Sequence, residues 1–316
     1  MFENMKVLCI GSAVIDITAR PVGQTEQWKE KQRISDIQIQ TGGDAANQSS
    51  HFAALGWEPG LISCIGADTN GKMLRAALES RGVDTSLVRV KEGCATGTAM
   101  VLVDGQGERH TFSVKGAHST LAKEDLPQGL PEECRAVSLA SLFSMPELER
   151  DGLEAFLLRA REEKKLIFAD LAADKLGQGL EGIRRFLPGL DYFLPSLYDV
   201  LEMTGTNTAE EAAHVFRSCG TAHVIIKCGA KGCYCDSDEF TGWIPAIPVK
   251  PVDTTGAGDC MTAVFAARIL SGDPLEKACR YACAAGSYST LFLGASTVEL
   301  SEDKLETFMN SLEGME

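Results

Sequence analysis

The chain has 316 residues, 44% of them apolar, and a formal net charge of −14 at pH 7. This apolar content is ample for a large core, and no apolar run reaches the roughly 18 residues that a membrane span needs. The negative charge disfavours nucleic acid and anionic membranes as partners. The eleven cysteines fall mostly in apolar segments, where a thiol packs as a small hydrophobic group, so we expect a reducing cytoplasm as the location.

Short apolar strand patterns alternate with helical patterns along the chain. Strands are predicted at residues 7–10, 61–65, 136–142, 166–170, 192–194 and 224–227. Helices are predicted at residues 45–55, 72–80, 153–163 and 209–218. Such alternation is typical of an α/β fold, with a mostly parallel sheet covered by helices on both faces. No repeat or linker divides the chain, so we predict a single domain over residues 1–316.

Two amphipathic regions interrupt this alternation. Ile37 and Ile39 have the period of a strand, and residues 98–103 and 108–114 flank a glycine-containing turn as in a hairpin. We therefore predict an accessory sheet with strands from about 12–40 and 97–116. It would serve as a lid over a substrate or pair with the lid of another subunit. The alternative is a surface hairpin without a catalytic role.

A loop of small residues precedes the first long helix. Residues 41–48 read Thr-Gly-Gly-Asp-Ala-Ala-Asn-Gln, and the paired glycines allow the backbone to approach a ligand closely. Asp44 can cap the helix, and Asn47 offers both a donor and an acceptor for a hydroxyl group. Asp16 follows the first strand among apolar residues. It either solvates the strand end or accepts hydrogen bonds from a polyol.

A second loop of small residues, 253–260, reads Asp-Thr-Thr-Gly-Ala-Gly-Asp-Cys and precedes a largely apolar helical stretch. Small residues expose backbone N–H groups, and a helix N-terminus adds unpaired donors and partial positive charge. Asp259 falls in the first turn, where we expect the helix to keep it ionised. This pattern favours phosphoryl transfer, although an ordinary capped turn is the alternative. Further on, Asp273 is predicted to cap a second helix, with Pro274 as its first residue.

Together, the two loops resemble in order and separation the two signature regions of the PfkB (ribokinase-like) carbohydrate kinase family. The likeness covers nearly the whole chain and includes residues 65–71, 107–109 and 227–232. It implies a doubly wound, mostly parallel α/β fold with a small β-sheet lid. It also implies ATP-dependent phosphorylation of a hydroxyl on a sugar or sugar-like acceptor, with Mg²⁺ and, in many members, K⁺.

The resemblance assigns roles to individual residues. Asp259 would be the base that takes the proton of the hydroxyl. The other expected site residues are Gly256, Ala257 and Gly258 for the anion hole; Asp16, Gly42, Gly43 and Asn47 for the acceptor; Lys227, Gly229, Gly232 and Gly258 for ATP; Asp253 and Thr255 for a monovalent cation; and Asp199 for Mg²⁺.

The sequence departs from the family pattern at several positions. The family often has Asn-x-x-Glu near the metal and the phosphates, whereas this chain has Ser196 and Asp199, which keeps a carboxylate and loses the amide. Ribokinases have a lysine where Asp44 stands. The acceptor is therefore open among hexoses, ketoses, sugar acids and nucleosides. The lack of a basic cluster near Asp16 or Asn47 favours a neutral sugar.

Other function classes remain as alternatives. Ser196 motivates a non-catalytic ligand-binding regulator, and a nucleoside kinase would share the fold. A dinucleotide-dependent oxidoreductase would need Gly-x-Gly-x-x-Gly after the first strand, where residues 11–13 are Gly-Ser-Ala. The expected partners are a small-molecule sugar and ATP, without nucleic acid or membrane, in a homodimer formed through the lid.

Overall fold

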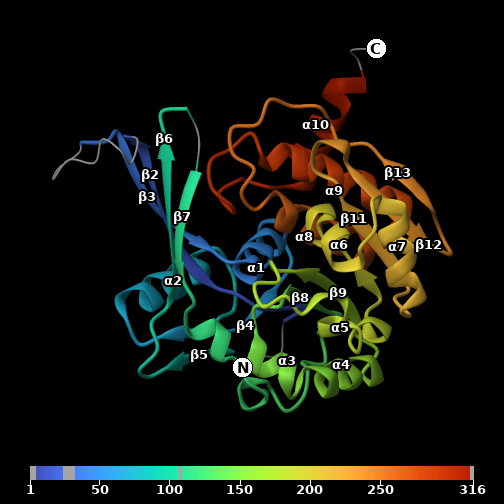
Figure 1. Ribbon diagram of the computed structural model, residues 1–316, viewed down its shortest axis with the longest axis horizontal. Helices are drawn as coiled ribbons and strands as arrows, with labels where there is room; N and C mark the ends of the chain where they lie inside the picture. Colours follow the sequence, from blue (N-terminus) through green and yellow to red (C-terminus); the bar gives the residue numbers. More distant parts are fainter. Residues whose placement is uncertain (1–4, 24–32, 107–108, 314–316) are drawn as a thin grey trace.

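The central sheet has nine strands in the part of the chain that the computed structural model describes, residues 5–23, 33–106 and 109–313 (Figure 1). Their order across the sheet is β13-β12-β11-β10-β9-β8-β1-β4-β5. The strands span Val7–Ile10 (β1), Pro59–Gly66 (β4), Val88–Lys91 (β5), Ala136–Leu142 (β8), Leu166–Leu171 (β9), Tyr192–Phe193 (β10), His223–Lys227 (β11), Cys233–Ser237 (β12) and Gly242–Ile244 (β13). The six strands predicted from the sequence are confirmed.

Strand direction in this sheet is parallel from β11 to β5, and antiparallel only at β11–β12 and β12–β13. The strands β1, β4 and β8 are buried along their whole length, which explains why their sequences are largely apolar, with serine as the polar residue of β4 and β8. Because parallel strands end at the same edge, the residues that follow β1, β9 and β11 are brought together there. Ligands of open α/β sheets bind at this edge.

Helices cover both faces of the sheet, and alternate residues of the strands contribute to two separate apolar clusters. One face packs against α1 (Asp44–Ala54), α2 (Thr69–Ser80), α8 (Ala257–Leu270) and α9 (Leu275–Ser289). The other face packs against α3 (Pro146–Arg150), α4 (Leu153–Glu162), α5 (Gly179–Ile183), α6 (Leu197–Thr204) and α7 (Ala209–Ser218). The last helix, α10 (Glu302–Glu313), packs on α9. The helices that the sequence predicted are confirmed.

The start of α9 differs from the prediction. Pro274 is the N-cap rather than the first helical residue, and the helix begins at Leu275. The carboxylate of Asp273 forms ion pairs with Arg268 and Lys277 instead of capping the helix. A charged partner gives a carboxylate a stronger hydrogen bond than a neutral backbone N–H, which accounts for this arrangement.

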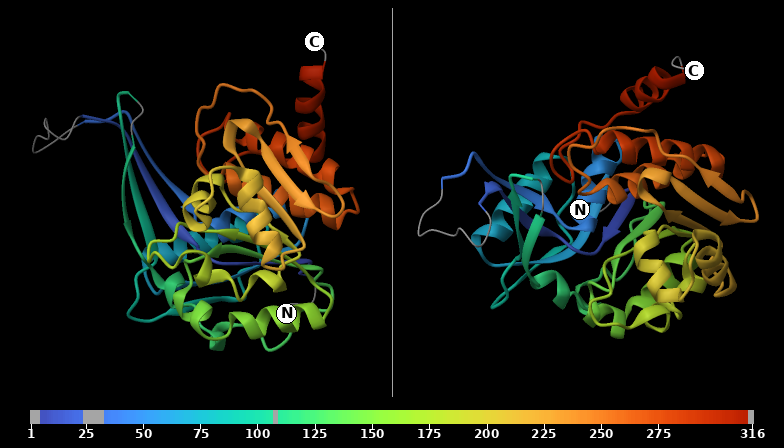
Figure 2. Two further views of the ribbon diagram at one scale, coloured as in Figure 1. Left: turned by 45° about the vertical axis from the view of Figure 1, so that its right-hand side comes forward. Right: turned by 45° about the horizontal axis from the view of Figure 1, so that its top comes forward.

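A second, smaller sheet has the strand order β3-β2-β6-β7 and projects from the main body (Figures 1 and 2). Its strands are β2 (Val14–Val22), β3 (Asp36–Gly42), β6 (Gly97–Asp104) and β7 (Arg109–Val114). β2 pairs in parallel with β6, and the two outer pairs are antiparallel. The predicted accessory sheet is therefore present. The turn residues 107 and 108 lie outside the described residues, as does the side chain of Arg109.

The two faces of this sheet, which we call the lid sheet, differ in chemistry. Directly opposed residues share a face, so Ile39, Ile17, Met100 and Phe112 form one apolar row across the four strands. The opposite face carries Asp16, Thr18, Gln38 and Gln40. On this polar face, the Gln40 side chain lies against Gly294 of the main body. The polar face therefore faces the main body at Gly294. The apolar face packs against the core at Ile17 and is exposed at Ile39, Met100 and Phe112.

Candidate active site

The helix α8 begins at Ala257, and Gly256 is its N-cap. Gly256 has a φ of 73°, in the left-handed region that favours glycine. A Cβ on this residue would also lie 2.4 Å from the carbonyl oxygen of Ala295. Only glycine can therefore form this turn without displacing the neighbouring backbone. The N–H of Ala257 donates to the carbonyl of Thr254 at 3.3 Å, and the next N–H groups of α8 lie at the helix N-terminus, where they have no intrahelical acceptors.

Asp259 lies in the first turn of α8 and is only 8% exposed. Its Oδ2 accepts a hydrogen bond of 2.8 Å from Nδ2 of Asn47, and its Oδ1 accepts one of 3.3 Å from Nε2 of Gln48. The orientation of Gln48 is set in turn by Ser138, whose hydroxyl donates to Oε1 at 2.7 Å. The two predicted loops thus meet through these amide–carboxylate contacts, although more than 200 residues separate them in sequence.

The ionisation of Asp259 differs from the sequence-based expectation. Burial raises the pKa of this carboxyl well above its ordinary value, and the nearby carboxylate of Asp44 raises it further, while the hydrogen bond from Asn47 opposes the rise. The helix N-terminus therefore does not by itself keep Asp259 ionised. A raised pKa makes the carboxylate a stronger proton acceptor, which suits a general base.

The predicted acceptor residues lie around the same carboxylate. In the described structure, Oδ1 of Asn47 is buried without a hydrogen-bond partner, while its Nδ2 donates to Asp259. Gly42 lies directly against Asp16, since a Cβ on Gly42 would be 2.0 Å from Oδ2 of that aspartate. Burial raises the pKa of Asp16 to about 6. An unpartnered acceptor and a partly buried carboxylate both fit hydroxyl groups of a ligand.

Asp44 is held by serines of two neighbouring segments. Its Oδ2 accepts a 3.0 Å hydrogen bond from the hydroxyl of Ser141, and its backbone N–H donates to Oγ of Ser12 at 2.9 Å. Burial raises the pKa of Asp44 to about 6, and the Asp170 carboxylate adds to this rise, while Ser141 and Lys227 oppose it. The prediction that Asp44 caps α1 is wrong, because Asp44 is the first residue of the helix and Gly43 is its N-cap, without a side-chain capping hydrogen bond. The site thus contains an aspartate at the position where ribokinases have a lysine.

Lys227, the last residue of β11, lies beside the N-terminus of α8. Its ammonium forms a buried ion pair with Asp170 and lies 3.4 Å from Oγ1 of Thr262. It is also 3.3 Å from the position that a Cβ on Gly258 would take. The structure therefore brings together Lys227 and Gly258, two of the residues predicted to bind ATP. The other two, Gly229 and Gly232, bracket the short turn that follows β11.

The residues predicted to bind cations lie in two separate segments of the chain. Oδ1 of Asp253 accepts hydrogen bonds from the N–H and the hydroxyl of Thr255, and Oδ2 accepts one from the N–H of Gly294. Asp199 lies on α6, where burial and then the Asp170 carboxylate raise its pKa and Lys227 lowers it. Within residues 5–23, 33–106 and 109–313, no three His, Cys, Asp or Glu side chains converge closely enough to hold a metal ion.

Sequence reasoning gave no role to Gln48, Asp170 or Thr262. Asp170 carried a usable signal, because it lies near the carboxyl end of a buried parallel strand, the edge at which such sheets bind ligands. Thr262 carried none, because a threonine within an apolar helix is a common packing residue. Gln48 followed a recognised motif, but only the fold shows that its amide reaches Asp259.

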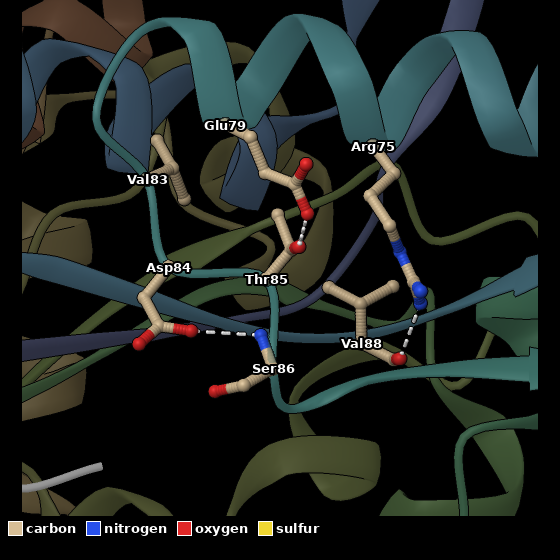
Figure 3. Close-up of a pocket in the computed structure, with 7 residues that line it drawn as sticks. All are labelled: Arg75, Glu79, Val83, Asp84, Thr85, Ser86 and Val88. Carbon is tan, nitrogen blue, oxygen red and sulfur yellow. Dashed lines mark hydrogen bonds between the residues drawn. The ribbon is translucent and has the colours of Figure 1, made fainter. Parts of the chain in front are cut away.

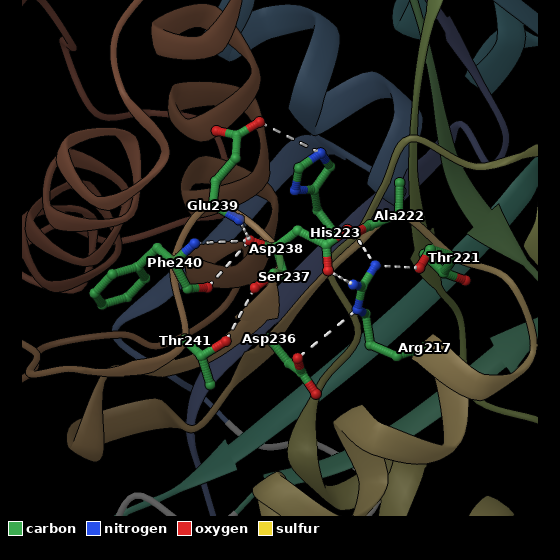
Figure 4. Close-up of polar contacts among 10 residues, drawn as sticks. All are labelled: Arg217, Thr221, Ala222, His223, Asp236, Ser237, Asp238, Glu239, Phe240 and Thr241. Carbon is green, nitrogen blue, oxygen red and sulfur yellow. Dashed lines mark hydrogen bonds and ion pairs between the residues drawn. The ribbon is translucent and has the colours of Figure 1, made fainter.

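Two surface pockets in the described structure lie away from this centre. One is lined by α2 and the segment leading to β5, and Thr85 donates there to Glu79 and Ser86 to Asp84 (Figure 3). The other surrounds Arg217, whose guanidinium contacts the carbonyl of Thr221 and the carboxylate of Asp236 (Figure 4). These polar groups already pair with one another, and neither pocket shares a residue with the Asp259 centre.

None of the described helices is long and apolar enough to cross a bilayer.

Comparison with known proteins agrees with this geometry. A family model described as pfkB family carbohydrate kinase matches residues 4–302. The ribokinase of Haemophilus influenzae is 29% identical over 86% of this chain and 88% of that protein. The aminoimidazole riboside kinase of Salmonella typhimurium is 28% identical over 97% of this chain and 95% of that protein.

A solved structure shows the same fold. It is that of an E. coli protein assigned as a ribokinase II, in complex with ATP and Mg²⁺, and it has a TM-score of 0.82 at 24% identity. The match covers 97% of this chain and 99% of that chain. The predicted fold class, a doubly wound sheet with a small lid, is confirmed.

Proposed function

The chain belongs to the pfkB family of carbohydrate kinases, enzymes that phosphorylate a sugar-like hydroxyl with ATP, and we propose that Asp259 is its general base and an uncharged sugar or nucleoside its acceptor. The observation that carries this proposal is the contact between the two loops. Asn47 donates to Asp259 with its nitrogen and leaves its buried oxygen without a partner in the described structure. A hydroxyl group placed between them would donate to Asn47 or Asp259.

In the proposed reaction, Asp259 takes the proton of the acceptor hydroxyl as its oxygen attacks the γ-phosphorus. General-base catalysis contributes about 10²–10⁴-fold to the rate. The N–H groups at the start of α8 would receive the negative charge of the phosphoryl group. In comparable sites each such donor contributes about 3–4 kcal/mol to transition-state stabilisation. Asn47 and Gln48 hold the base in place, which keeps the reacting atoms aligned.

The charge of the site supports an uncharged acceptor. Asp16, Asp44 and Asp259 all belong to the acceptor side, where burial raises the pKa of each. Lys227 lies on the side of α8 and is already paired with Asp170. A phosphate or carboxylate on the acceptor would therefore meet acids without a free cation among the described residues that line this side. Like charges at short range disfavour such a ligand.

The residues present fit the cations that the family uses. Asp199 offers the carboxylate oxygen that Mg²⁺ prefers, and we propose that it contacts the metal of MgATP directly or through water. When bound, Mg²⁺ would neutralise part of the charge of the phosphates. Asp253 and Thr255 present oxygens in a loop that contacts the backbone N–H of Gly294. Such oxygens suit a monovalent cation such as K⁺.

We also propose that the protein is a homodimer joined through the apolar face of the lid sheet. Met100 is 43% exposed and Phe112 is 60% exposed on this face, and Ile37, Ile39 and Val114 are exposed beside them. A contiguous apolar patch of this kind marks an interaction surface. In this arrangement the chain is one folded unit whose polar lid face covers the acceptor. Lid closure would exclude water from the phosphoryl group.

A cytoplasmic location is part of the proposal. All eleven cysteines are free thiols in the described structure, and eight of them are buried. Proteins rich in unpaired thiols are typical of reducing compartments.

An acceptor panel tests the proposed function. ADP release is measured with MgATP and matched pairs of uncharged and charged compounds: D-ribose and ribose 5-phosphate, D-fructose and fructose 6-phosphate, adenosine and AMP. We expect an uncharged member to be preferred by at least about 100-fold in kcat/KM. The reason is that placing a negatively charged acceptor beside the acids of the site costs several kcal/mol. Turnover only with the charged members would show that the acceptor class is wrong. If the protein binds ATP but no sugar or nucleoside stimulates ADP release, the result would favour the non-catalytic regulator.

A further inference from the structure

We propose that Lys227 is a catalytic residue that places its ammonium on the phosphoryl group during transfer, with Asp170 and Thr262 as its positioning residues. This inference rests on the proposed function and adds a side-chain cation to an anion hole otherwise built from backbone N–H groups. It concerns the part of the site that sequence reasoning treated only as a general ATP-binding segment.

The three residues form a closed hydrogen-bonded network from three elements. The ammonium of Lys227, at the end of β11, pairs with Oδ2 of Asp170 near the end of β9. The hydroxyl of Thr262, on the second turn of α8, donates to the same Asp170 oxygen at 3.0 Å and lies 3.4 Å from the ammonium. Lys227 is 9% exposed and Asp170 is 4% exposed. A side chain fixed from two directions in this way has little freedom to point elsewhere.

This network holds the ammonium against the first turn of α8. The nitrogen of Lys227 is 3.3 Å from the position of a Cβ on Gly258, and the next residue in the chain is Asp259. Gly258 thus provides room for the lysine beside the N–H groups that would bind the phosphoryl oxygens. The ammonium and those donors therefore converge on the same anion.

Stability alone does not explain a buried pair at this position. Removing a lysine and an aspartate from water costs several kcal/mol per ion, and an apolar pair of similar volume is often as stable. Moreover, the charge of Lys227 affects other acids besides its ion-pair partner Asp170. It opposes the pKa rise that burial causes in Asp44, Asp199 and Asp259. A cation that lowers the pKa of several acids in the site can also compensate the negative charge of a nucleotide that binds there.

The acceptor oxygen forms a bond to the γ-phosphorus, and the bond from that phosphorus to the bridging oxygen breaks with its electron pair left on ADP. The proton of the acceptor goes to Asp259. Lys227 keeps its proton and contacts a non-bridging oxygen of the phosphoryl group throughout. It therefore compensates charge without taking part in proton transfer.

Substitution of Lys227 tests the role in catalysis. With the panel acceptor that gives the wild type its highest rate, we expect Lys227→Met to lower kcat at least about 100-fold, as loss of one anion-hole donor does. Lys227→Arg keeps a cation and should recover at least about tenfold relative to the methionine variant. Asp170→Asn keeps the ammonium but loosens it, and its kcat should fall by about tenfold. A kcat of Lys227→Met within about threefold of the wild type would overturn the proposal.

A structural role of the pair is separated by two controls. Lys91→Met removes a comparable lysine from Asp125, which it contacts at 2.6 and 2.7 Å at the far edge of the sheet. This variant should lower the Tm and leave kcat unchanged. The double variant Asp170→Asn/Lys227→Met no longer buries an unpaired charge, so its Tm should exceed that of Lys227→Met while its kcat stays low. Recovery of kcat together with Tm would mean that the pair is only structural.

Nucleotide binding gives a result that does not depend on any acceptor. By calorimetry, Lys227→Met should weaken MgATP at least about tenfold more than MgADP, because a charged hydrogen bond to the γ-phosphoryl group is lost. Equal effects on the two nucleotides would overturn the inference. If no panel compound is phosphorylated, the proposed function fails, and this comparison still decides where the Lys227 ammonium lies.

Discussion

Asp16, Asp44 and Asp259 lie in one small site, where ionising all three together is costly. Their burial therefore affects how the stability of the protein depends on pH. Burial raises the pKa of both Asp16 and Asp44 to about 6, above the ordinary value of an aspartate. The folded protein therefore holds protons that the unfolded chain has already released. Between about pH 4 and 6, stability falls as the pH rises, and above that range the loss is complete.

Asp44→Asn should remove the share of this loss that Asp44 contributes. The amide can still accept the hydrogen bond from Ser141, so we expect the variant to be more stable than the wild type at pH 7.5 by about 1–3 kcal/mol and equal to it near pH 4. Urea unfolding at the two pH values measures this difference. Equal stability at pH 7.5 would show that Asp44 is ionised without cost.

Asp273→Asn is the control with the opposite sign. Burial raises the pKa of Asp273, but hydrogen bonds from Lys277 and Arg268 lower it more, so the pKa lies below its ordinary value. This group stabilises the folded state above the unfolded pKa and loses that effect as the pH falls. The variant should therefore be less stable than the wild type at pH 7.5, with a smaller difference in acid.

Some features of the site could not be predicted from residues that are adjacent in the sequence. Asp259 and Asn47 were predicted because each lies in a motif whose residues are adjacent in sequence. The network of Asp170, Lys227 and Thr262 joins positions 35–92 residues apart, so it exists only after folding. The pKa of Asp259 is raised despite its place at a helix N-terminus, for a reason of magnitude. A helix N-terminus contributes about 0.3–2 kcal/mol, whereas full burial shifts a carboxyl pKa by up to several units.

At the scale of single elements, α8 unites the site because its N-terminus supplies both the base and the anion hole. Its ends are formed by glycines with similar backbone angles, Gly256 with a φ of 73° and Gly272 with a φ of 89°. Their surroundings differ, since a Cβ at Gly256 would strike Ala295 and one at Gly272 would meet nothing within 4 Å.

This difference makes a matched pair of substitutions. Gly272→Ala should cost about 1 kcal/mol of stability, from the backbone angle alone, and leave kcat unchanged. Gly256→Ala should cost clearly more and lower kcat, because the turn that presents the N–H groups must shift. Chemical denaturation and the ADP-release assay measure both. Equal stability losses, or full activity in Gly256→Ala, would contradict the account of this turn.

The elements themselves were largely predictable, and their exact ends were not. The strands that are buried on both sides carry largely apolar sequences, so β1 and β8 were predicted at the bounds that the structure has. The start of α9 was misplaced because Asp273 has two cationic partners within reach. One of them, Arg268, lies on the preceding helix, and a capping rule considers only local backbone donors.

On the scale of the whole molecule, the alternation of strands and helices was enough to predict the main sheet, whereas the position of the lid sheet relative to the body was not. The apolar row of Ile39, Ile17, Met100 and Phe112 becomes visible only from the cross-strand register. Its exposure is the basis of the proposed dimer, because apolar surface of this extent is unfavourable in contact with water.

Charges introduced into this row should separate the subunits. Met100→Glu combined with Phe112→Glu should reduce the mass in sedimentation equilibrium from about twice 33.9 kDa to that of one chain. Leu158→Glu is the control, since Leu158 is an exposed apolar residue of α4 on the main body, and this variant should stay dimeric. A monomeric wild type at micromolar concentration, or a dimer that tolerates both glutamates, would contradict the proposal.

The most direct test of the account is acceptor-dependent ADP release by the wild type and by Asp259→Asn in the same assay. Because asparagine keeps the size and some hydrogen bonds but cannot accept the proton, kcat should fall at least about 100-fold with little change in the Kd of MgATP. Circular dichroism and the Tm confirm that the variant is folded. Turnover of Asp259→Asn close to that of the wild type would show that the proton leaves by another route and that Asp259 is not the base.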